Sequence, residues 1–318
     1  MDIMENLLNF LKNKKALEFN FVWMFALAIG ALILFLAIFS AGKFIKSESY
    51  EAETLTAKQI VNIFETAETG IAEGVRMEAL SLKDETKIID YCSDYETFGN
   101  QKIGISSKIL GKWQETGARI ETSNKYIFSD DVEQGKKFYY FSKTFSMPFK
   151  VAELIFLSGK KYCFVNAPKE IYDEASFLMG NLVNCSDDTI KVCFNRPCEI
   201  TVTGLCLRGC DSEYDYGTVS KDGKTMTYVD GLMYGAIFAS YDIYECNVKR
   251  LGKRLGYQAE LISKQASFIS GKCETNLLDL SGIAVSGKKI KNSQDLLLIK
   301  DSADNADRAN MAGECKLW

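Results

Sequence analysis

Ten cysteines are the residues of this sequence with the clearest capacity for chemistry. They are Cys92, Cys163, Cys185, Cys193, Cys198, Cys206, Cys210, Cys246, Cys273 and Cys315. The four from Cys193 to Cys210 lie close enough along the chain to hold a tetrahedral zinc ion, or to form two local disulfides. Neither Cys193–Cys198 nor Cys206–Cys210 has the Cys-x-x-Cys spacing of a redox motif.

The position of the cysteines favours disulfides over zinc. All ten follow a long apolar run, and an even number confined to one side of such a run is typical of an oxidising compartment. We therefore expect up to five disulfides. Cys273 and Cys315 are expected to tie down the C-terminal segment, but the spacing does not determine the pairing.

Acidic residues offer a second, weaker site. Asp211, Glu213 and Asp215 alternate as calcium ligands do, but the glycine and the final glutamate of an EF-hand loop are out of place. An acidic surface loop is the favoured interpretation, so we expect no metal and no other cofactor.

Several classes of protein are disfavoured by composition. The chain has no histidine, which excludes Ser-His-Asp triads and HExxH zinc sites. It also lacks a Walker loop, a Rossmann fingerprint and a GxSxG motif. With 38 Lys and Arg against 42 Asp and Glu, the formal net charge is −4. We expect neither an enzyme nor a nucleic-acid partner.

The apolar run that precedes the cysteines predicts a membrane helix. No charge occurs between Phe21 and Ala41, and this run at 1.5 Å per residue spans roughly 30 Å, the thickness of a bilayer core. A core helix of a globular protein would rarely be apolar on every face. A cleaved signal peptide is the other alternative, but cleavage after Ala41 would place the bulky Phe39 at the −3 position. An uncleaved anchor in membrane lipid is therefore favoured.

The orientation of the anchor can be inferred from the charges beside it and from the positions of the cysteines. Lysines flank both ends, which gives only a slight bias; they are Lys12, Lys14 and Lys15 before the run and Lys43 and Lys46 after it. The cysteines give stronger evidence, because all ten follow the run and disulfides form outside the cytoplasm. We expect a single-pass cell-membrane protein with a cytoplasmic N-terminus and an extracytoplasmic main domain.

The chain is predicted to have four parts: a leader over 1–16, a transmembrane helix over 17–46, an amphipathic helix over 47–84, and an α+β domain over 85–318 with antiparallel strands and C-terminal helices. The β-branched and aromatic runs predict strands at Lys87–Tyr91, Phe138–Phe145, Ala152–Leu157, Tyr162–Val165, Ile190–Phe194 and Glu199–Val202.

Turn and helix signals complete this plan. Asp222-Gly223 predicts a type I′ turn inside a hairpin over Thr218–Val229. A helix is expected after Pro168, a long one over Tyr241–Ile269, and shorter ones over Glu274–Leu280 and Ser293–Ala312. In the long helix the basic residues are expected to be exposed; they are Lys249, Arg250, Lys253 and Arg254.

The start of the anchor reads Lys14-Lys15-Ala16-Leu17-Glu18-Phe19 and then enters the apolar run. This segment resembles the N-terminus of archaeal type IV pilin-like proteins, over about residues 12–45. The resemblance implies that a peptidase cuts between Ala16 and Leu17, and that Glu18 assists assembly by pairing with a neighbouring subunit's α-amino group. Two departures from the pattern are that Glu18 would be the second mature residue rather than the fifth, and that Ala16 replaces the usual glycine.

The rest of the chain resembles uncharacterised single-span surface proteins of small-genome archaea, on segments such as Tyr162–Pro168 and Ile243–Arg250. This resemblance implies a location at the cell surface but no particular activity. We therefore expect a non-enzymatic, pilin-like or minor-pilin-like surface subunit that assembles with like subunits through its N-terminal helix. The alternatives are a monotopic receptor or adhesion module that keeps its N-terminus, and a metal-dependent envelope enzyme.

Overall fold

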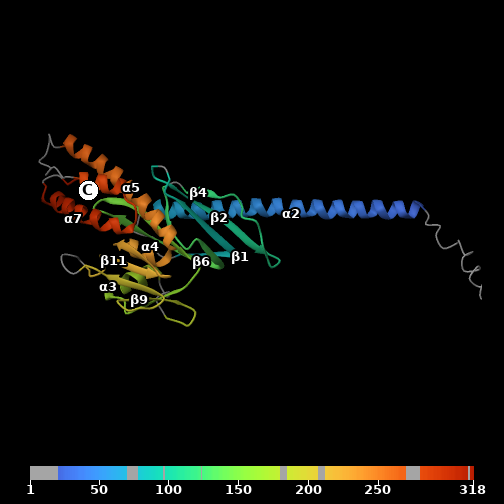
Figure 1. Cartoon of the computed structure of the whole chain (residues 1–318), viewed down its shortest axis with the longest axis horizontal. Helices are drawn as coiled ribbons and strands as arrows, with labels where there is room; N and C mark the ends of the chain where they lie inside the picture. Colours follow the sequence, from blue (N-terminus) through green and yellow to red (C-terminus); the bar gives the residue numbers. More distant parts are fainter. Residues whose placement is uncertain are drawn as a thin grey trace, which may run out of the picture. The chain divides into compact units, whose positions relative to one another are not determined.

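A computed structural model describes residues 21–69, 78–95, 97–122, 124–179, 185–206, 212–269, 280–313 and 316–318. The chain divides into two compact units, Met1–Ser49 and Tyr50–Trp318. The expected α+β class is confirmed, with a long apolar helix near the N-terminus followed by mixed sheets and helices (Figure 1). The expected processing and assembly residues Ala16, Leu17 and Glu18 lie outside the described residues.

Helix α2 (Phe21–Thr69) is a single helix of 49 residues. Its N-terminal half is long and apolar enough to cross a membrane, and its most apolar window is wholly exposed. Its C-terminal half is amphipathic as predicted, because Ala57, Ile60, Val61 and Phe64 are buried against strands. The predicted end at residue 84 is wrong, since α2 ends at Thr69 and strand β1 already begins at Glu78. The alternating burial along β1 shows the period of a strand rather than that of a helix.

In the described part of the chain, the larger sheet has seven strands in the order β3-β2-β1-β6-β7-β5, with β4 paired to β2. These strands are β1 (Glu78–Ser93), β2 (Asn100–Ile109), β3 (Lys112–Trp113), β4 (Ile120–Thr122), β5 (Tyr126–Phe128), β6 (Val132–Ser146) and β7 (Lys150–Ser158). Most neighbours are antiparallel, as expected, but β5 and β7 are parallel.

Around β7, both faces of this sheet are buried. On β7, Ile155 and Leu157 join the cluster that contains α2, whereas Leu154 and Phe156 join the larger core on the other face. Successive side chains of a strand point to opposite faces, so continuous apolar runs such as β7 indicate packing on both sides. The predicted strand Phe138–Phe145 lies in β6, and Phe138 and Phe141 are buried core residues.

The smaller sheet has the order β12-β11-β10-β9-β8 among the described residues. Its strands are β8 (Tyr162–Val165), β9 (Ile190–Phe194), β10 (Ile200–Gly204), β11 (Tyr216–Lys221) and β12 (Lys224–Val229). Strands β8, β9 and β10 are parallel, which the expectation of antiparallel strands missed. The predicted hairpin is confirmed: Asp222 and Gly223 both have positive φ, at 52° and 73°, between β11 and β12.

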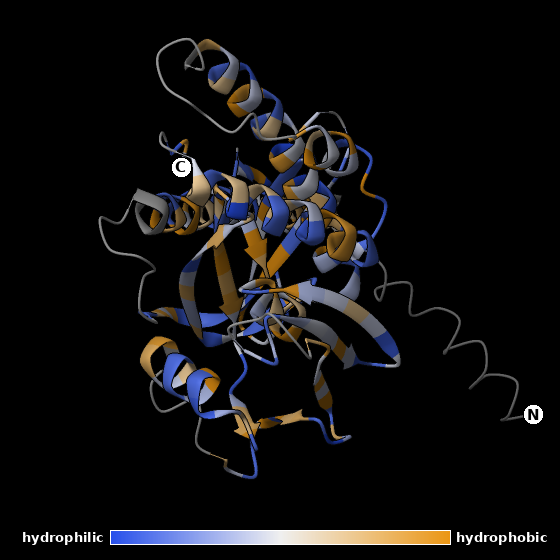
Figure 2. Cartoon of the chain, turned by 90° about the vertical axis from the view of Figure 1, so that its left-hand side faces the viewer, coloured by the Kyte–Doolittle hydropathy of each residue, from blue (hydrophilic) through white to orange (hydrophobic). Residues whose placement is uncertain are grey.

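The remaining helices are α3 (Lys169–Met179), α4 (Leu232–Phe238), α5 (Tyr241–Ile269), α6 (Ser281–Lys288) and α7 (Leu296–Ala312), with a 3-10 turn η3 (Ser293–Asp295) before α7. Helix α5 has the predicted bounds. The helices beside the end marked C lie on one side of the strands and carry both hydrophilic and hydrophobic residues (Figure 2). No helix is predicted between the hairpin and Tyr241, but α4 is a helix whose seven residues are all buried. The expected helix over Glu274–Leu280 lies almost wholly outside the described residues.

Candidate functional site

Within the described residues, three disulfides have both partners placed: Cys92–Cys246, Cys163–Cys185 and Cys193–Cys198. The expectation of disulfides is therefore confirmed. Cys206 is also disulfide-bonded, and none of the described cysteines is free. Zinc is ligated by cysteine thiolates, and a disulfide has none, so the four-cysteine zinc alternative does not hold for Cys193, Cys198 and Cys206. Cys210, Cys273 and Cys315 lie outside the described residues.

Two carboxylates of the calcium candidate lie in the described part of the chain, and both accept hydrogen bonds from other residues. Asp211 lies outside the described residues. Glu213 accepts a hydrogen bond from the Asn195 side chain at 3.2 Å, and Asp215 accepts one from the backbone N–H of Ser212 at 3.0 Å. Over the ranges that the structure describes, no group of three or more potential metal ligands occurs.

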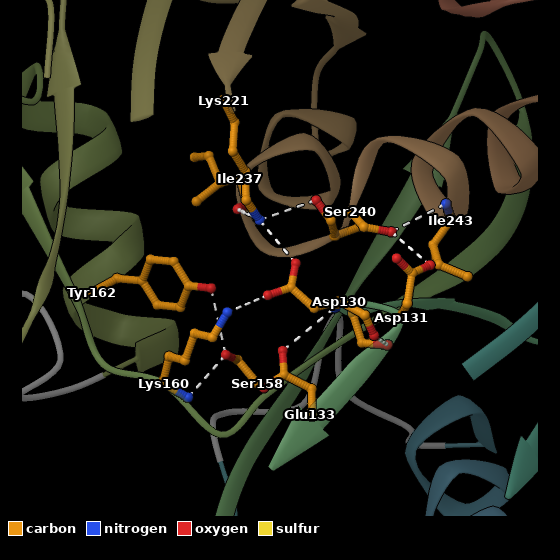
Figure 3. Close-up of polar contacts among 12 residues, drawn as sticks. Asp130, Asp131, Glu133, Ser158, Lys160, Tyr162, Lys221, Ile237, Ser240 and Ile243 are labelled. Carbon is orange, nitrogen blue, oxygen red and sulfur yellow. Dashed lines mark hydrogen bonds and ion pairs between the residues drawn. The ribbon is translucent and has the colours of Figure 1, made fainter. Parts of the chain in front are cut away.

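A charged cluster joins the two sheets around the loop between β5 and β6. Figure 3 shows the Asp130 carboxylate between the ammonium groups of Lys160 and Lys221. The Lys221 Nζ atom lies 3.0 Å from Asp130 and also donates to the Ala239 carbonyl oxygen at 3.2 Å, just beyond α4. Burial alone would raise the pKa of Asp130, but the charges of Lys221 and Lys160 outweigh it and hold that pKa below its usual value. The cluster therefore fixes the β11–β12 hairpin and α4 to the larger sheet.

Two neighbouring contacts extend this cluster. The Ser240 hydroxyl donates to Asp131 at 3.0 Å and also caps α5, because it accepts the N–H of Ile243 at 3.4 Å (Figure 3). Glu133, which is 1% exposed, accepts the N–H of Gly159 at 2.8 Å. Burial raises the pKa of Glu133 to about 7.

A second, fully buried polar network lies between β1, β2, β5 and α5. The Gln101 amide nitrogen lies 2.8 and 2.6 Å from the two carboxylate oxygens of Asp90, and the Ser129 hydroxyl donates to the same carboxylate at 3.0 Å. Both Gln101 and Asn247 also donate to the Ile127 carbonyl oxygen at 2.7 Å. The network thus supplies hydrogen bonds to the backbone of β5.

Arg250 completes the network from α5. Its guanidinium donates to Asn247 at 2.7 Å, to Gln101 at 3.3 Å and to the Phe98 carbonyl oxygen at 3.2 Å, and lies 4.8 Å from the Tyr126 ring centroid. The prediction that Arg250 is exposed is wrong, because only 1% of it is accessible. Helical spacing alone could not separate it from its basic neighbours, since its partners come from strands far away in the sequence.

The chemistry of these sites is that of buried ionisable groups locked by hydrogen bonds. Burial raises the pKa of Asp90 to about 7, although hydrogen bonds from Gln101 and Ser129 and the charge of Arg250 lower it. A carboxyl group that titrates near neutral pH is typical of a catalytic acid, but it is also found in structural networks. Asp90 is only 4% exposed and its oxygens already accept hydrogen bonds from the chain, so the arrangement supports a structural role.

These shifts predict that the chain is more stable at about pH 4–5 than at pH 7–8. Between the unfolded and folded pKa values of Asp90 and Glu133, the folded state binds protons that the unfolded state does not. Stability therefore falls as pH rises from about 4 to about 7, on the order of a few kcal/mol. Denaturant unfolding at several pH values checks this.

The Asp90→Asn variant should flatten that pH profile, whereas Asp173→Asn, which removes a carboxylate from an exposed position on α3, serves as the matched control. A wild-type profile that rises from pH 5 to pH 8 would contradict the assignment.

The fold and these sites define an α+β protein whose disulfide-bonded domain follows a long apolar helix. No protein-family model, no curated protein and no solved structure matches the chain. The function must therefore be argued from its own residues.

Proposed function

We propose that the chain is a non-enzymatic, membrane-anchored cell-surface protein: a pilin-like or minor-pilin-like subunit that assembles through its N-terminal helix. One observation carries the proposal. Helix α2 is continuous from Phe21 to Thr69, so a fully exposed apolar half leads without a linker into an amphipathic half that forms part of the domain core.

The N-terminal half of α2 exposes a large apolar surface. Its side chains include Phe25, Leu32 and Phe35, each more than half exposed, and water is a poor environment for so much apolar surface. Lipid or the helices of like subunits would cover it. The disulfides are consistent with an oxidising compartment, which supports an extracytoplasmic domain and a cytoplasmic N-terminus.

Processing of the leader tests the proposal directly. We expect the protein from native membranes to begin at Leu17, as measured by intact mass and N-terminal sequencing. The Ala16→Leu variant should retain Met1, because a bulky residue would replace the small last residue of the leader. The matched control, Ala41→Leu, should be processed normally. A wild-type chain that begins at Met1 would contradict the pilin-like proposal.

An anchored binding module that keeps its N-terminus is the second candidate, and one surface feature favours it. An open groove of about 320 Å³ lies beside α5, lined by Phe98, Tyr257 and Leu261 among others. The Phe98 and Tyr257 rings meet edge to face with centroids 5.4 Å apart. Retention of Met1 together with saturable binding by the outer domain would support this candidate instead.

A further inference from the structure

The turn between β2 and β3 presents an apolar tip. Leu110 and Gly111 both have positive φ, at 49° and 77°, and Ile109 pairs with Lys112 across the turn. Such positions usually hold glycine, asparagine or aspartate, because a larger side chain is strained there. Here a leucine occupies one of them, and it is 98% exposed beside a 41% exposed Ile109.

Two lysines lie against the ring of Trp113, three residues along the chain from Leu110. The Nζ atoms of Lys87 and Lys108 lie 4.2 Å and 5.6 Å from the centroid of the Trp113 ring. Lys108 also pairs with Glu85 at 2.8 Å, and Lys136 acts electrostatically on the same carboxylate. Five lysines lie on the strands at this end, against two carboxylates on the strands and that of Glu53 on α2; the lysines are Lys83, Lys87, Lys108, Lys112 and Lys136, and the strand carboxylates are Asp84 and Glu85. An exposed aliphatic tip with tryptophan and lysine beside it is the composition that favours the surface of a membrane.

The tip lies near the point where α2 enters the domain. The Ser107 N–H donates to the Glu53 carboxylate at 2.8 Å, and the Ala118 N–H donates to Thr54 at 2.9 Å. Helix α2 and strand β2 both belong to the core cluster that includes Phe64 and Ile105. Glu53 on α2 and Ser107 on β2 lie at the same edge of this cluster. From Ser107 the strand continues by three residues, about 10 Å, to Leu110.

The chain also limits the distance from Glu53 to a bilayer that holds the apolar run. Lys43 is the first charged residue after that run and precedes Glu53 by ten residues. Ten residues measure about 15 Å as a helix and at most about 35 Å when extended. In a chain anchored by this run, the membrane surface therefore lies within about 35 Å of Glu53.

We propose that the β2–β3 turn is a second membrane contact, in which Leu110 and Ile109 enter the headgroup region and the surrounding lysines face anionic phospholipids. This inference rests on the proposed anchoring of the apolar helix. The contact would set the orientation of the outer domain on the bilayer. Each lysine near an anionic surface adds attraction that decreases with ionic strength.

Lipid-borne quenching of a fluorescent amino acid tests the contact in the full chain. The label replaces Leu110 in one sample and Asp222 in the control, because Asp222 precedes a glycine in the same kind of positive-φ turn on the other sheet. Genetic incorporation of the fluorescent amino acid makes a thiol-reactive label unnecessary, so the native cysteines stay unmodified. The chain is reconstituted into phosphatidylcholine vesicles with and without phosphatidylglycerol, and doxyl-labelled lipid is the quencher.

We expect quenching at position 110 to be at least five times that at position 222, and to be several-fold stronger with phosphatidylglycerol. The double variant Lys112→Glu/Lys136→Glu should remove most of the phosphatidylglycerol effect. Equal quenching at positions 110 and 222 in a chain that resists carbonate extraction would overturn the contact and leave the anchor intact. Equal quenching at position 110 in both kinds of vesicle would overturn the role of the lysines. A chain that carbonate extracts would overturn both the contact and the proposed anchoring.

Discussion

Replacing Cys92 and Cys246 together by alanine is expected to lower the free energy of unfolding by roughly 5 kcal/mol. The disulfide joins β1 to α5 across a sequence separation of 154 residues. In the chain-entropy model, a cross-link stabilises a protein by restricting its unfolded state, and the effect grows with the logarithm of the loop length. Urea unfolding of the full chain in detergent, followed by circular dichroism, measures the change.

The matched control is the double variant Cys193→Ala/Cys198→Ala. That disulfide closes a loop across only five residues, so the same model gives roughly 2 kcal/mol. The comparison cancels the general effects of removing two sulfur atoms. Equal losses for the two double variants would show that the long disulfide contributes through local packing rather than through the entropy of the unfolded chain.

The elements predicted well from the sequence are those whose period or turn chemistry is local. Strands β8 and β9 have the predicted bounds because their β-branched and aromatic runs end at turn residues. Helix α5 has them because its apolar residues recur along one helical face, and they are buried there. The Asp222-Gly223 turn needs only two residues to specify positive φ.

The elements that were missed lack such a local signal. Helix α4 is apolar on every side because it is wholly buried, so its sequence has no helical period. The first half of β1, from Glu78 to Thr86, contains many polar residues, and such a composition also fits a helix. In both cases the tertiary environment decided between two compatible local structures.

The candidate sites could not be predicted from the sequence because they join distant residues. Arg250 meets Gln101 across 149 positions, and Lys221 meets Asp130 across 91. Nothing near Asp90 in the sequence indicates that its carboxylate is buried. By contrast, disulfides could be predicted from the number of cysteines and their position after the apolar run. Whether disulfides form depends mainly on the redox compartment, which does not require knowledge of the fold.

Replacing Arg250 by methionine is expected to cost roughly 3–5 kcal/mol, because removal of one partner leaves a buried charge and several buried acceptors without compensation. Methionine preserves most of the apolar stem, so the loss reflects the guanidinium and its contacts with Phe98, Gln101 and Asn247. The matched control is Arg254→Met, one turn further along α5, where the residue is half-buried and lies 5.9 Å from the same Tyr126 ring.

The dependence of this loss on pH identifies its cause. The charge of Arg250 lowers the pKa of Asp90, so it stabilises the ionised carboxylate. Because that pKa is about 7, Asp90 is mostly protonated at pH 5 and mostly ionised at pH 8. The cost of Arg250→Met should therefore be larger at pH 8 than at pH 5, and the cost of Asp90→Asn/Arg250→Met should be smaller than the sum of the two single changes. A cost that does not change with pH, together with additive single variants, would mean that Arg250 acts only through packing and its neutral hydrogen bonds.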